Sequence, residues 1–275
     1  MGLRINTNVA SLAAQRALSQ SQKSTERSMK QLATGNRFAD LSEGSADFAI
    51  AEHLKGQTKG MAAAKNNAEN AVSFVQVAEG GLNEQNNLLI RMRELAIQSA
   101  SDTFSDTERE MIEMEFQQLL TEFDRIAKTT SFGSQKLLSG VEKDYEFQVG
   151  AYKGEENIIR YQSNANTTAS ELGLDGMTVI EKTDARDSLE TIDIALTSLG
   201  RARANFGAMQ SRFDSVTSYT AVQMENLQAA QARIADTDVA KATSEMAKGI
   251  ALQQYQLAVL ATANQVPGQI LKLIA

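Results

Sequence analysis

Two stretches decide the fold of this chain: INTNVASLAAQRALSQSQKS at residues 5–24 and IALQQYQLAVLATANQVPGQILKLI at residues 250–274. Both are long, poor in charge, and repeat apolar residues at helical spacing, a pattern typical of amphipathic helices. A helix with an apolar stripe needs a second surface to bury it. The two ends therefore predict that one terminal helix pairs with the other, and that the chain assembles with further copies.

The composition favours a helical protein. Among the 275 residues, 42% are apolar, which suffices for a packed core, but only 5% are aromatic and none is Trp. A core of Ala, Leu, Ile, Val and Met suits close helix packing better than a β-sandwich. Proline, the main helix breaker, occurs once, at Pro267, so the sequence permits very long helices.

The residue types that most catalytic sites need are scarce. The chain has no Cys and a single His, His53, which excludes disulfides and zinc–thiolate sites and leaves no multi-histidine metal site. It holds no Walker motif, dinucleotide-binding loop, HExxH or nucleophile elbow. We therefore expect neither an enzyme nor a cofactor, and we interpret His53 as an ordinary helix residue.

The net charge of −7 is spread unevenly. Residues 1–37 carry six basic side chains and one acid, whereas residues 102–124 carry eight acids and one Arg. The basic residues lie in an Ala/Ser/Gln pattern without interleaved aromatics, so we interpret them as a solvated helix face, not a nucleic-acid arm. The longest uncharged run, residues 249–271, is rich in Gln and Asn, and no apolar leader follows Met1. We therefore expect no membrane insertion and no cleaved signal peptide.

Helical periodicity covers most of the chain. It predicts helices at about residues 7–32, 46–101, 106–130, 184–234 and from 239 to the C-terminus. Gly, Ser and Asp at 33–47 predict a loop, and the sequence ADTD at 235–238 predicts a second interruption. Ser105 and Glu108 have the spacing of a capping box at the start of the third helix.

Two of these helices carry sustained heptad seams, in which spacings of three and four residues alternate. The first seam consists of Ala68, Ala71, Val75, Ala78, Leu82, Gln85, Leu89, Met92, Ala96 and Ser99. The second consists of Leu189, Ile192, Leu196, Leu199, Arg203, Phe206, Gln210, Phe213, Thr217, Thr220, Met224, Leu227, Gln231 and Ile234. We expect both seams to pack on neighbouring helices. The Gly80-Gly81 pair in the first must be held by packing or mark a bend, because Gly disfavours helix.

Residues 131–180 have a different pattern. Six glycines separate short runs, and Tyr145, Phe147 and Val149 alternate with polar residues. A turn at 151–157 and a returning strand at 158–161 complete a predicted β-hairpin.

Together these elements predict a mainly α fold, with long antiparallel helices, paired termini and a small β-hairpin region in mid-sequence. The breaks in the pattern divide the chain into an N-terminal helix and loop at 1–44, a helical domain at 45–235 with its β region at about 133–180, and a C-terminal helix at 236–275.

Three blocks of the sequence, in order, resemble bacterial flagellin, the filament subunit. The N-terminal block runs from INTN at 5–8 to AD at 46–47. The middle block is RMRELAIQS at 91–99, followed by FDRI at 123–126. The C-terminal block is ARIADTD at 232–238, VLA at 259–261 and ANQVP at 263–267. The resemblance covers most of residues 1–140 and 185–275, and without a large mid-sequence domain the chain resembles a short flagellin.

The resemblance implies a structural subunit that polymerises into a helical tube and transmits motor torque for swimming. The terminal helices would form the inner core of the filament as a coiled coil, disordered in the free monomer and ordered in the polymer. The inner-core contacts would involve Ile5, Val9, Leu12, Leu257, Leu260, Asn264 and Leu271. Packing of the outer core would involve Leu82, Leu89, Met92, Leu199, Phe206, Phe213 and Leu227. In this family the proline of the C-terminal block lies within the core helix, whereas its ordinary interpretation is a helix end near Val266.

Several partners are also implied by the resemblance. They are copies of the chain, hook–filament junction and filament cap proteins, and an export chaperone at about residues 240–275, with type III export to an extracellular flagellum. Many flagellins contact a Toll-like receptor, and the matching positions here are Arg91, Leu95 and Glu115; Ile90 replaces the Gln of the best-recognised pattern, which implies weak recognition.

Alternatives stay open at this point. A hook–filament junction protein shares the terminal helices and the export route, and another exported coiled-coil assembly protein is a third interpretation. A sheathed or periplasmic filament, glycosylation and mixing with other flagellins are also left open. The length of the assembly separates the three classes, because they would form long filaments, a short ring, or neither.

Overall fold

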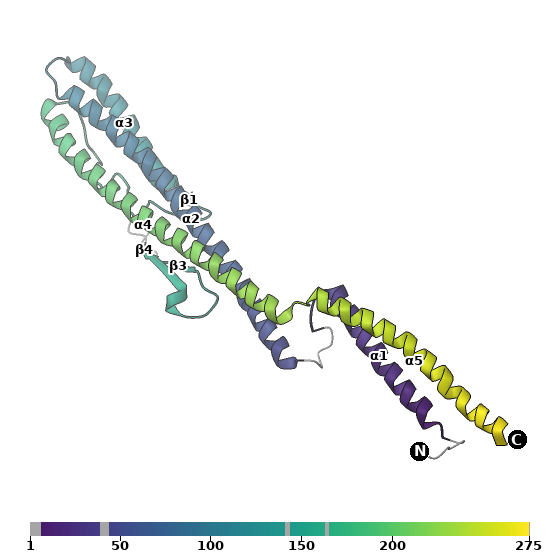
Figure 1. Cartoon of the computed structure of the whole chain (residues 1–275). Helices are drawn as coiled ribbons and strands as arrows, with labels where there is room; N and C mark the ends of the chain where they lie inside the picture. Colours follow the sequence, from purple (N-terminus) through teal and green to yellow (C-terminus); the bar gives the residue numbers. More distant parts are fainter. Residues whose placement is uncertain (1–6, 39–43, 141–143, 163–164, 275) are drawn as a thin grey trace. The chain divides into compact units, whose positions relative to one another are not determined.

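The computed structural model describes residues 7–38, 44–140, 144–162 and 165–274. Long helices dominate these residues (Figure 1). They are α1 (Val9–Thr34), α2 (Ser45–Ser99), α3 (Asp106–Thr129), α4 (Lys182–Ala235) and α5 (Val239–Ile274). The predicted mainly α fold is confirmed, and the predicted breaks at 33–47 and 235–238 separate the helices as expected.

The strands form two small antiparallel hairpins. In the first, β1 (Ser131–Phe132) pairs with β2 (Gln135–Lys136); in the second, β3 (Asp144–Gln148) pairs with β4 (Ile158–Gln162). The second is the predicted hairpin, and a short 3₁₀ helix, Glu155–Asn157, lies in its connection. Sequence analysis missed the first, whose turn uses Gly133 at a positive φ of 58°. The strands occupy only part of the expected β region, because residues 165–181 form turns.

By their contacts, the residues fall into two compact units. One unit contains residues 1–58 and 225–275, and the other contains residues 59–224. These divisions lie inside α2 and α4 and differ from the boundaries at 44/45 and 235/236 that the sequence breaks suggest. The reason is that both long helices continue without interruption across the change of unit.

The core of the 59–224 unit lies along the two heptad seams. All ten residues of the α2 seam are at most 2% exposed, including its polar members Gln85 and Ser99. The α4 seam is buried or half-buried along its length. Gln85 donates through Nε2 to the Phe123 and Thr167 carbonyl oxygens at 3.2 and 3.1 Å. The two polar seam residues therefore serve buried backbone acceptors that would otherwise lack a partner.

Aromatic rings fix the β3–β4 hairpin on this helical core. The Phe74 ring of α2 makes edge contacts with Tyr145 and Phe147 of β3, at centroid distances of 4.9 and 5.7 Å. From β4, Tyr161 lies 5.4 Å from the Phe206 ring of α4. Burial among these rings raises the pKa of Tyr161 to about 12.

The Gly80-Gly81 pair is accommodated by packing, without a break in α2. A Cβ atom at Gly81 would lie 2.6 Å from Thr130 Oγ1 and 2.9 Å from Leu138 Cδ1. At Gly80 nothing lies within 4 Å of such an atom. Gly81 therefore permits a close approach of the segment after α3, whereas Gly80 has no such role.

The turn between α2 and α3 is held by a buried arginine. Arg109, on the first turns of α3, donates to the Ser99 and Ser101 carbonyl oxygens at 3.0 and 2.8 Å. These carbonyls lie at the end of α2, where helical partners are missing. The predicted capping interaction is also present, since the Glu108 carboxylate accepts a hydrogen bond from the Ser105 backbone N–H at 2.7 Å.

Candidate functional site

The terminal helices α1 and α5 form an antiparallel pair (Figure 1). Near one end of the pair, Asn8 Nδ2 donates to the Ala263 carbonyl oxygen at 2.7 Å, and Ser11 Oγ donates to Asn264 Oδ1 at 2.7 Å. Further along, Ser21 Oγ donates to the Gly249 carbonyl oxygen at 3.3 Å. The partners lie at 263–264 for residues 8–11 and at 249 for residue 21, which fixes the antiparallel direction.

The seam between the two helices is made of small side chains. On α1 the buried residues are Ser11, Ala14, Ser21, Thr25 and Ser28. On α5 they include Ala242 and Ala263. At Gly249 a Cβ atom would lie 2.4 Å from Thr25 Oγ1, so the missing side chain allows close contact of the helices. Small residues let backbones approach, but they bury little apolar area, and hydrophobic stabilisation scales with that area.

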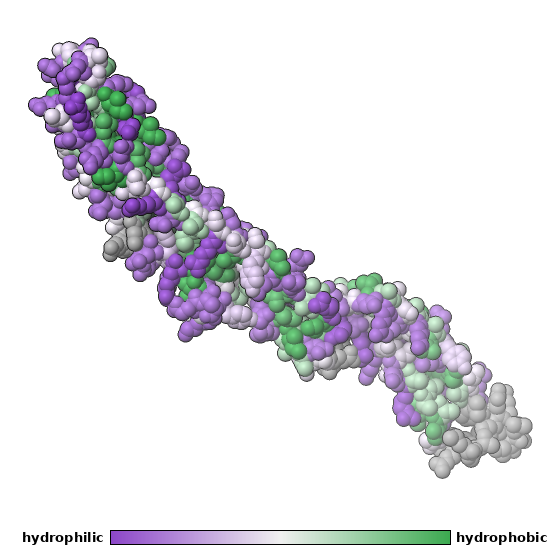
Figure 2. Space-filling model, turned by 60° about the vertical axis from the view of Figure 1, so that its left-hand side comes forward, coloured by the Kyte–Doolittle hydropathy of each residue, from purple (hydrophilic) through white to green (hydrophobic). Residues whose placement is uncertain are grey.

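The large apolar side chains of the pair point away from this seam. Val9, Leu12 and Leu257 are 56%, 50% and 54% exposed, and Tyr255 is 69% exposed. Figure 2 shows green hydrophobic surface over the helices of this pair. Several exposed large apolar side chains on one helix pair indicate an interaction site.

The inner-core residues expected from the sequence divide into three groups. Val9, Leu12 and Leu257 are exposed, and Leu260 is half-buried. Asn264 is bonded across the seam, as described above. Ile5 and the side chain of Leu271 lie outside the described residues.

Sequence reasoning missed the Ser/Thr/Ala seam. Its signal was present, because residues 14, 21, 25 and 28 repeat at spacings of seven, four and three. The apolar stripe drew attention because it carries the larger residues, but the smaller ones decide which faces of α1 and α5 meet.

Beyond Val266 the helix α5 continues to Ile274, in agreement with the helix predicted from 239 onward, and the alternative of a helix end near Val266 is not observed. Proline removes one backbone donor from a helix but does not always end it. The position of the proline within the helix agrees with what the resemblance implied.

The two connections between the helices are tied together by backbone hydrogen bonds. After α1, Gly35 adopts the left-handed conformation with φ of 68°. The Arg37 N–H then donates to the Ala235 carbonyl oxygen at 2.7 Å, and the Thr237 N–H donates to the Gly35 carbonyl oxygen at 2.9 Å. Arg37 also forms an ion pair with Asp47 at 2.7 Å.

Most of the expected outer-core residues lie in the core of the 59–224 unit. Leu82, Leu89, Met92, Leu199, Phe206 and Phe213 all belong to its buried cluster. Leu227 is half-buried and lies in the other unit.

Of the expected receptor contacts, only two are on the surface. Arg91 and Glu115 form an exposed ion pair at 2.7 Å. The hydrogen bond that Arg91 donates to the Glu115 carboxylate raises the pKa of Arg91, and a second hydrogen bond to Glu94 adds to the effect. Leu95 is only 2% exposed, so its side chain packs in the core. Burial of Leu95 in the single chain therefore argues against a contact of its side chain with a receptor.

Across residues 7–38, 44–140, 144–162 and 165–274, no helix combines the length and apolarity that crossing a membrane requires. In the same ranges no cluster of three or more His, Asp or Glu side chains could hold a metal ion.

Comparison with protein families decides the class of this chain. The model of the bacterial flagellin N-terminal helical region matches residues 5–143, and that of the C-terminal helical region matches residues 189–274. The chain belongs to the bacterial flagellins. It is a structural subunit of the flagellar filament, and the family comparison does not favour the alternative of a hook–filament junction protein.

Individual flagellar proteins are similar in sequence to this chain over almost its whole length. A flagellin of Halalkalibacterium halodurans is 34% identical over 271 residues, covering 98% of this chain and 99% of the relative. A flagellar filament 30.7 kDa core protein of Treponema maltophilum is 33% identical over 290 residues, covering 98% of this chain and 99% of the relative. The match therefore spans nearly the full length of these relatives as well as of this chain.

Solved structures share the fold. The crystal structure of Bacillus cereus flagellin has a TM-score of 0.50 and 25% identity, covering 56% of this chain and 88% of that one. A putative flagellar hook-associated protein from Vibrio parahaemolyticus has a TM-score of 0.60 but 15% identity, covering 70% of this chain and 100% of that one. The second likeness concerns the fold alone.

Proposed function

We propose that this chain polymerises through the outer apolar faces of α1 and α5, which become the inner core of an extracellular flagellar filament. The observation that carries the proposal is the arrangement of side chains on the terminal pair. Small residues such as Ser21 and Ala263 lie between the helices, while Leu12, Tyr255 and Leu257 lie on the solvent side.

The energetics favour burial of this surface between copies. Covering a large apolar side chain contributes about 1.5–3 kcal/mol relative to leaving it exposed. Tyr255 and Leu257 on α5 and Val9 and Leu12 on α1 are more than half or about half exposed in the single chain. A contact between different faces of successive copies does not close and generates an open helical filament.

The helices that surround this inner core have a mechanical role in the proposal. The buried seams of α2 and α4 would form the outer core, with Leu82, Leu89 and Phe206 as packing residues. Continuous helices with dense cores deform little, because packed interiors have low compressibility. Such subunits can transmit motor torque along the filament, and shifts between subunit rows would set its curvature.

The same proposal includes the partners that this family implies. They are junction and cap proteins at the filament ends, an export chaperone on residues 240–275, and other flagellins in a mixed filament. Recognition by a Toll-like receptor would be weak, because Ile90 lies beside Arg91 and the Leu95 side chain is buried.

Electron microscopy of the purified chain tests the central claim. The intact chain is incubated with a precipitating salt or filament seeds, beside a chain that lacks residues 241–275. We expect long filaments from the intact chain only. A monodisperse oligomer from the intact chain would contradict the proposal and favour a short ring assembly.

Point variants locate the assembly surface within the pair. We expect Leu12→Glu with Leu257→Glu to block filament growth, because both charges would be buried without partners. The matched control is Ile180→Glu, on an isoleucine that is 47% exposed in the other unit. Equal growth of both variants would contradict a role for the terminal faces.

A further inference from the structure

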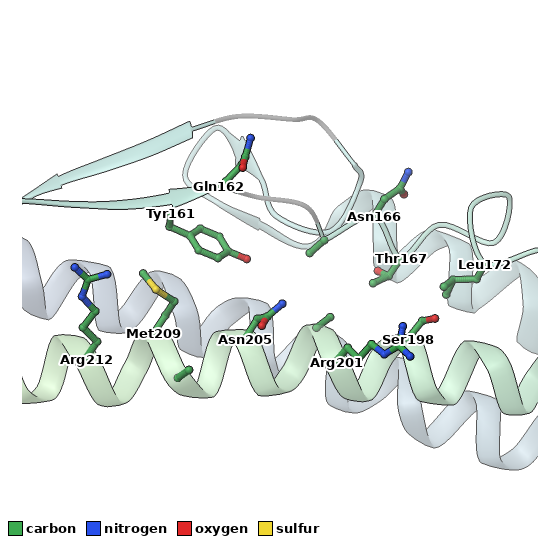
Figure 3. Close-up of a pocket in the computed structure, with 13 residues that line it drawn as sticks. Tyr161, Gln162, Asn166, Thr167, Leu172, Ser198, Arg201, Asn205, Met209 and Arg212 are labelled. Atoms are coloured by element: carbon green, nitrogen blue, oxygen red, sulfur yellow. The ribbon is translucent and has the colours of Figure 1, made fainter.

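A groove runs along the exposed side of α4 in the 59–224 unit (Figure 3). It has a volume of about 560 Å³ and lies between α4 and a wall formed by Tyr161, Gln162, Ala165, Asn166, Thr167 and Leu172. Half-buried Leu172, Ala202 and Met209 give it an apolar floor. Arg201 and Arg212 extend from α4 toward the two ends of the groove, with Asn205 between them.

Within the part of the chain that the structure describes, several other cations of the unit are held in ion pairs, whereas these two arginines are not. Arg91 pairs with Glu115, Arg93 with Asp193, and Arg160 with Glu146. Arg201 and Arg212 are exposed and have no ion-pair partner among the described residues. The groove thus combines an apolar floor with two cations that have no acid to neutralise them.

The chain itself carries a surface of matching chemistry. Residues 102–124, which include most of α3, hold eight acids and one Arg. On this helix Glu110 is exposed and makes no ion pair among the described residues. Met111 and Met114, one and four positions further, are 61% and 64% exposed. Residues at these spacings share one helix face, so α3 presents an acid beside two flexible apolar side chains.

We propose that the Arg201–Arg212 groove receives the Glu110–Met114 face of α3 from a second copy of this chain. This rests on the proposed polymerisation and assigns it a specific contact in the outer core. The Glu110 carboxylate would pair with one of the two arginines, and a methionine would enter between Ala202 and Met209, since methionine adapts to irregular gaps.

A second copy fits the groove because one chain supplies both complementary surfaces. The groove and the α3 face are different surfaces of the same unit, so the contact joins unlike faces and repeats in one direction. Contacts of this type extend without closing, which is the geometry a filament needs. Opposite charges across the contact also speed association, so their reversal lowers the rate of growth.

A charge-swap experiment tests the proposal, with seeded filament growth followed by sedimentation and electron microscopy. The groove variant carries Arg201→Glu and Arg212→Glu, and the face variant carries Glu110→Lys and Gln118→Lys, because Gln118 is exposed on the same face of α3. We expect each variant alone to grow at least about tenfold more slowly than the unchanged chain. The mixture should regain growth, because each variant's α3 then meets a groove of opposite charge.

The control for the groove variant is Arg186→Glu with Lys153→Glu. It changes the net charge by the same amount as the groove variant, at exposed positions outside the groove. Circular dichroism verifies that all variants keep their helices. If the unchanged chain forms no filaments, the proposed polymerisation itself fails. If it forms filaments and the groove variant grows as fast as the control, or the mixture gains nothing, the groove contact is overturned and the groove belongs to another partner.

Discussion

At the residue scale, a few buried contacts determine which substitutions this flagellin fold accepts without losing stability. Arg109, Gln85 and Gly81 all lie in the 59–224 unit, where a buried donor or a missing side chain has one specific neighbour. The sequence did not identify the atoms that these residues contact, because their partners lie 8 to 82 positions away along the chain.

The two adjacent glycines of α2 give a matched pair of variants. Gly81→Ala places a Cβ 2.6 Å from Thr130 Oγ1, and we expect a loss of about 1–3 kcal/mol in the free energy of unfolding. Gly80→Ala meets nothing within 4 Å, so it should gain about 0.5–1 kcal/mol through helix propensity. Denaturant unfolding measures both values. Equal effects at the two positions would show that Gly81 is not a packing site.

Arg109 provides a second test of a buried contact. Arg109→Met should lower the free energy of unfolding by about 2–3 kcal/mol, because the Ser99 and Ser101 carbonyl oxygens lose their charged donor. As a control, Arg125→Met removes an exposed ion pair with Glu122 and should leave the unfolding midpoint almost unchanged. Thermal unfolding followed by circular dichroism compares the two.

The raised pKa of Tyr161 leads to a prediction of how the free energy of unfolding changes at alkaline pH. Its pKa is raised from 10.0 in the open chain to about 12 in the folded protein. Between these values the unfolded chain loses the phenolic proton first, so the free energy of unfolding falls as pH rises from 10 toward 12. Tyr161→Phe removes this contribution and should show a shallower loss than the unchanged chain over that range. Parallel pH profiles for the two proteins would mean that Tyr161 ionises equally in both states.

At the scale of elements, the seams explain what could be predicted. The α2 and α4 seams follow from spacing alone, since alternation of three and four residues places one face of a helix in a core. The α1–α5 seam did not follow, because small side chains give a weak hydrophobic signal, although Ser21 and Thr25 decide how the helices meet. The β1–β2 hairpin was also missed, since two-residue strands carry no pattern.

Gly249 tests the close packing of α1 and α5. We expect Gly249→Ala to weaken the pair, because its Cβ would lie 2.4 Å from Thr25 Oγ1, and to raise the concentration needed for filament growth. Thr25→Ala removes the clashing atom, so the double variant should recover part of the lost growth. A double variant no better than Gly249→Ala alone would place the defect elsewhere. The comparison is a double-mutant cycle on the critical concentration.

At the scale of the whole molecule, the two compact units differ in what stabilises them. The 59–224 unit has a cluster of buried Leu, Ile, Phe and Met side chains, whereas the α1–α5 seam consists of Ser, Thr and Ala. Apolar area buried on folding sets most of the stability, so the terminal pair should be the weaker part of a single chain.

Amide hydrogen exchange tests this difference. In the free chain we expect α1 and α5 to exchange much faster than the α2 and α4 seams. In filaments the same terminal amides should become protected, because neighbouring copies cover the outer apolar faces. Strong protection of α1 and α5 in a dilute monomer would contradict the idea that assembly orders them.

The sequence by itself determined the helical class, the breaks between helices, the main hairpin and the membership of a filament family. These features depend on local spacing, on turn residues and on motif blocks, all of which are written along the chain. Only the tertiary structure decided which side of each terminal helix is buried, that Leu95 turns inward, and that Arg201 and Arg212 line a groove. The physical reason is that burial and charge pairing depend on neighbours distant in sequence, and spacing within one helix does not specify those neighbours.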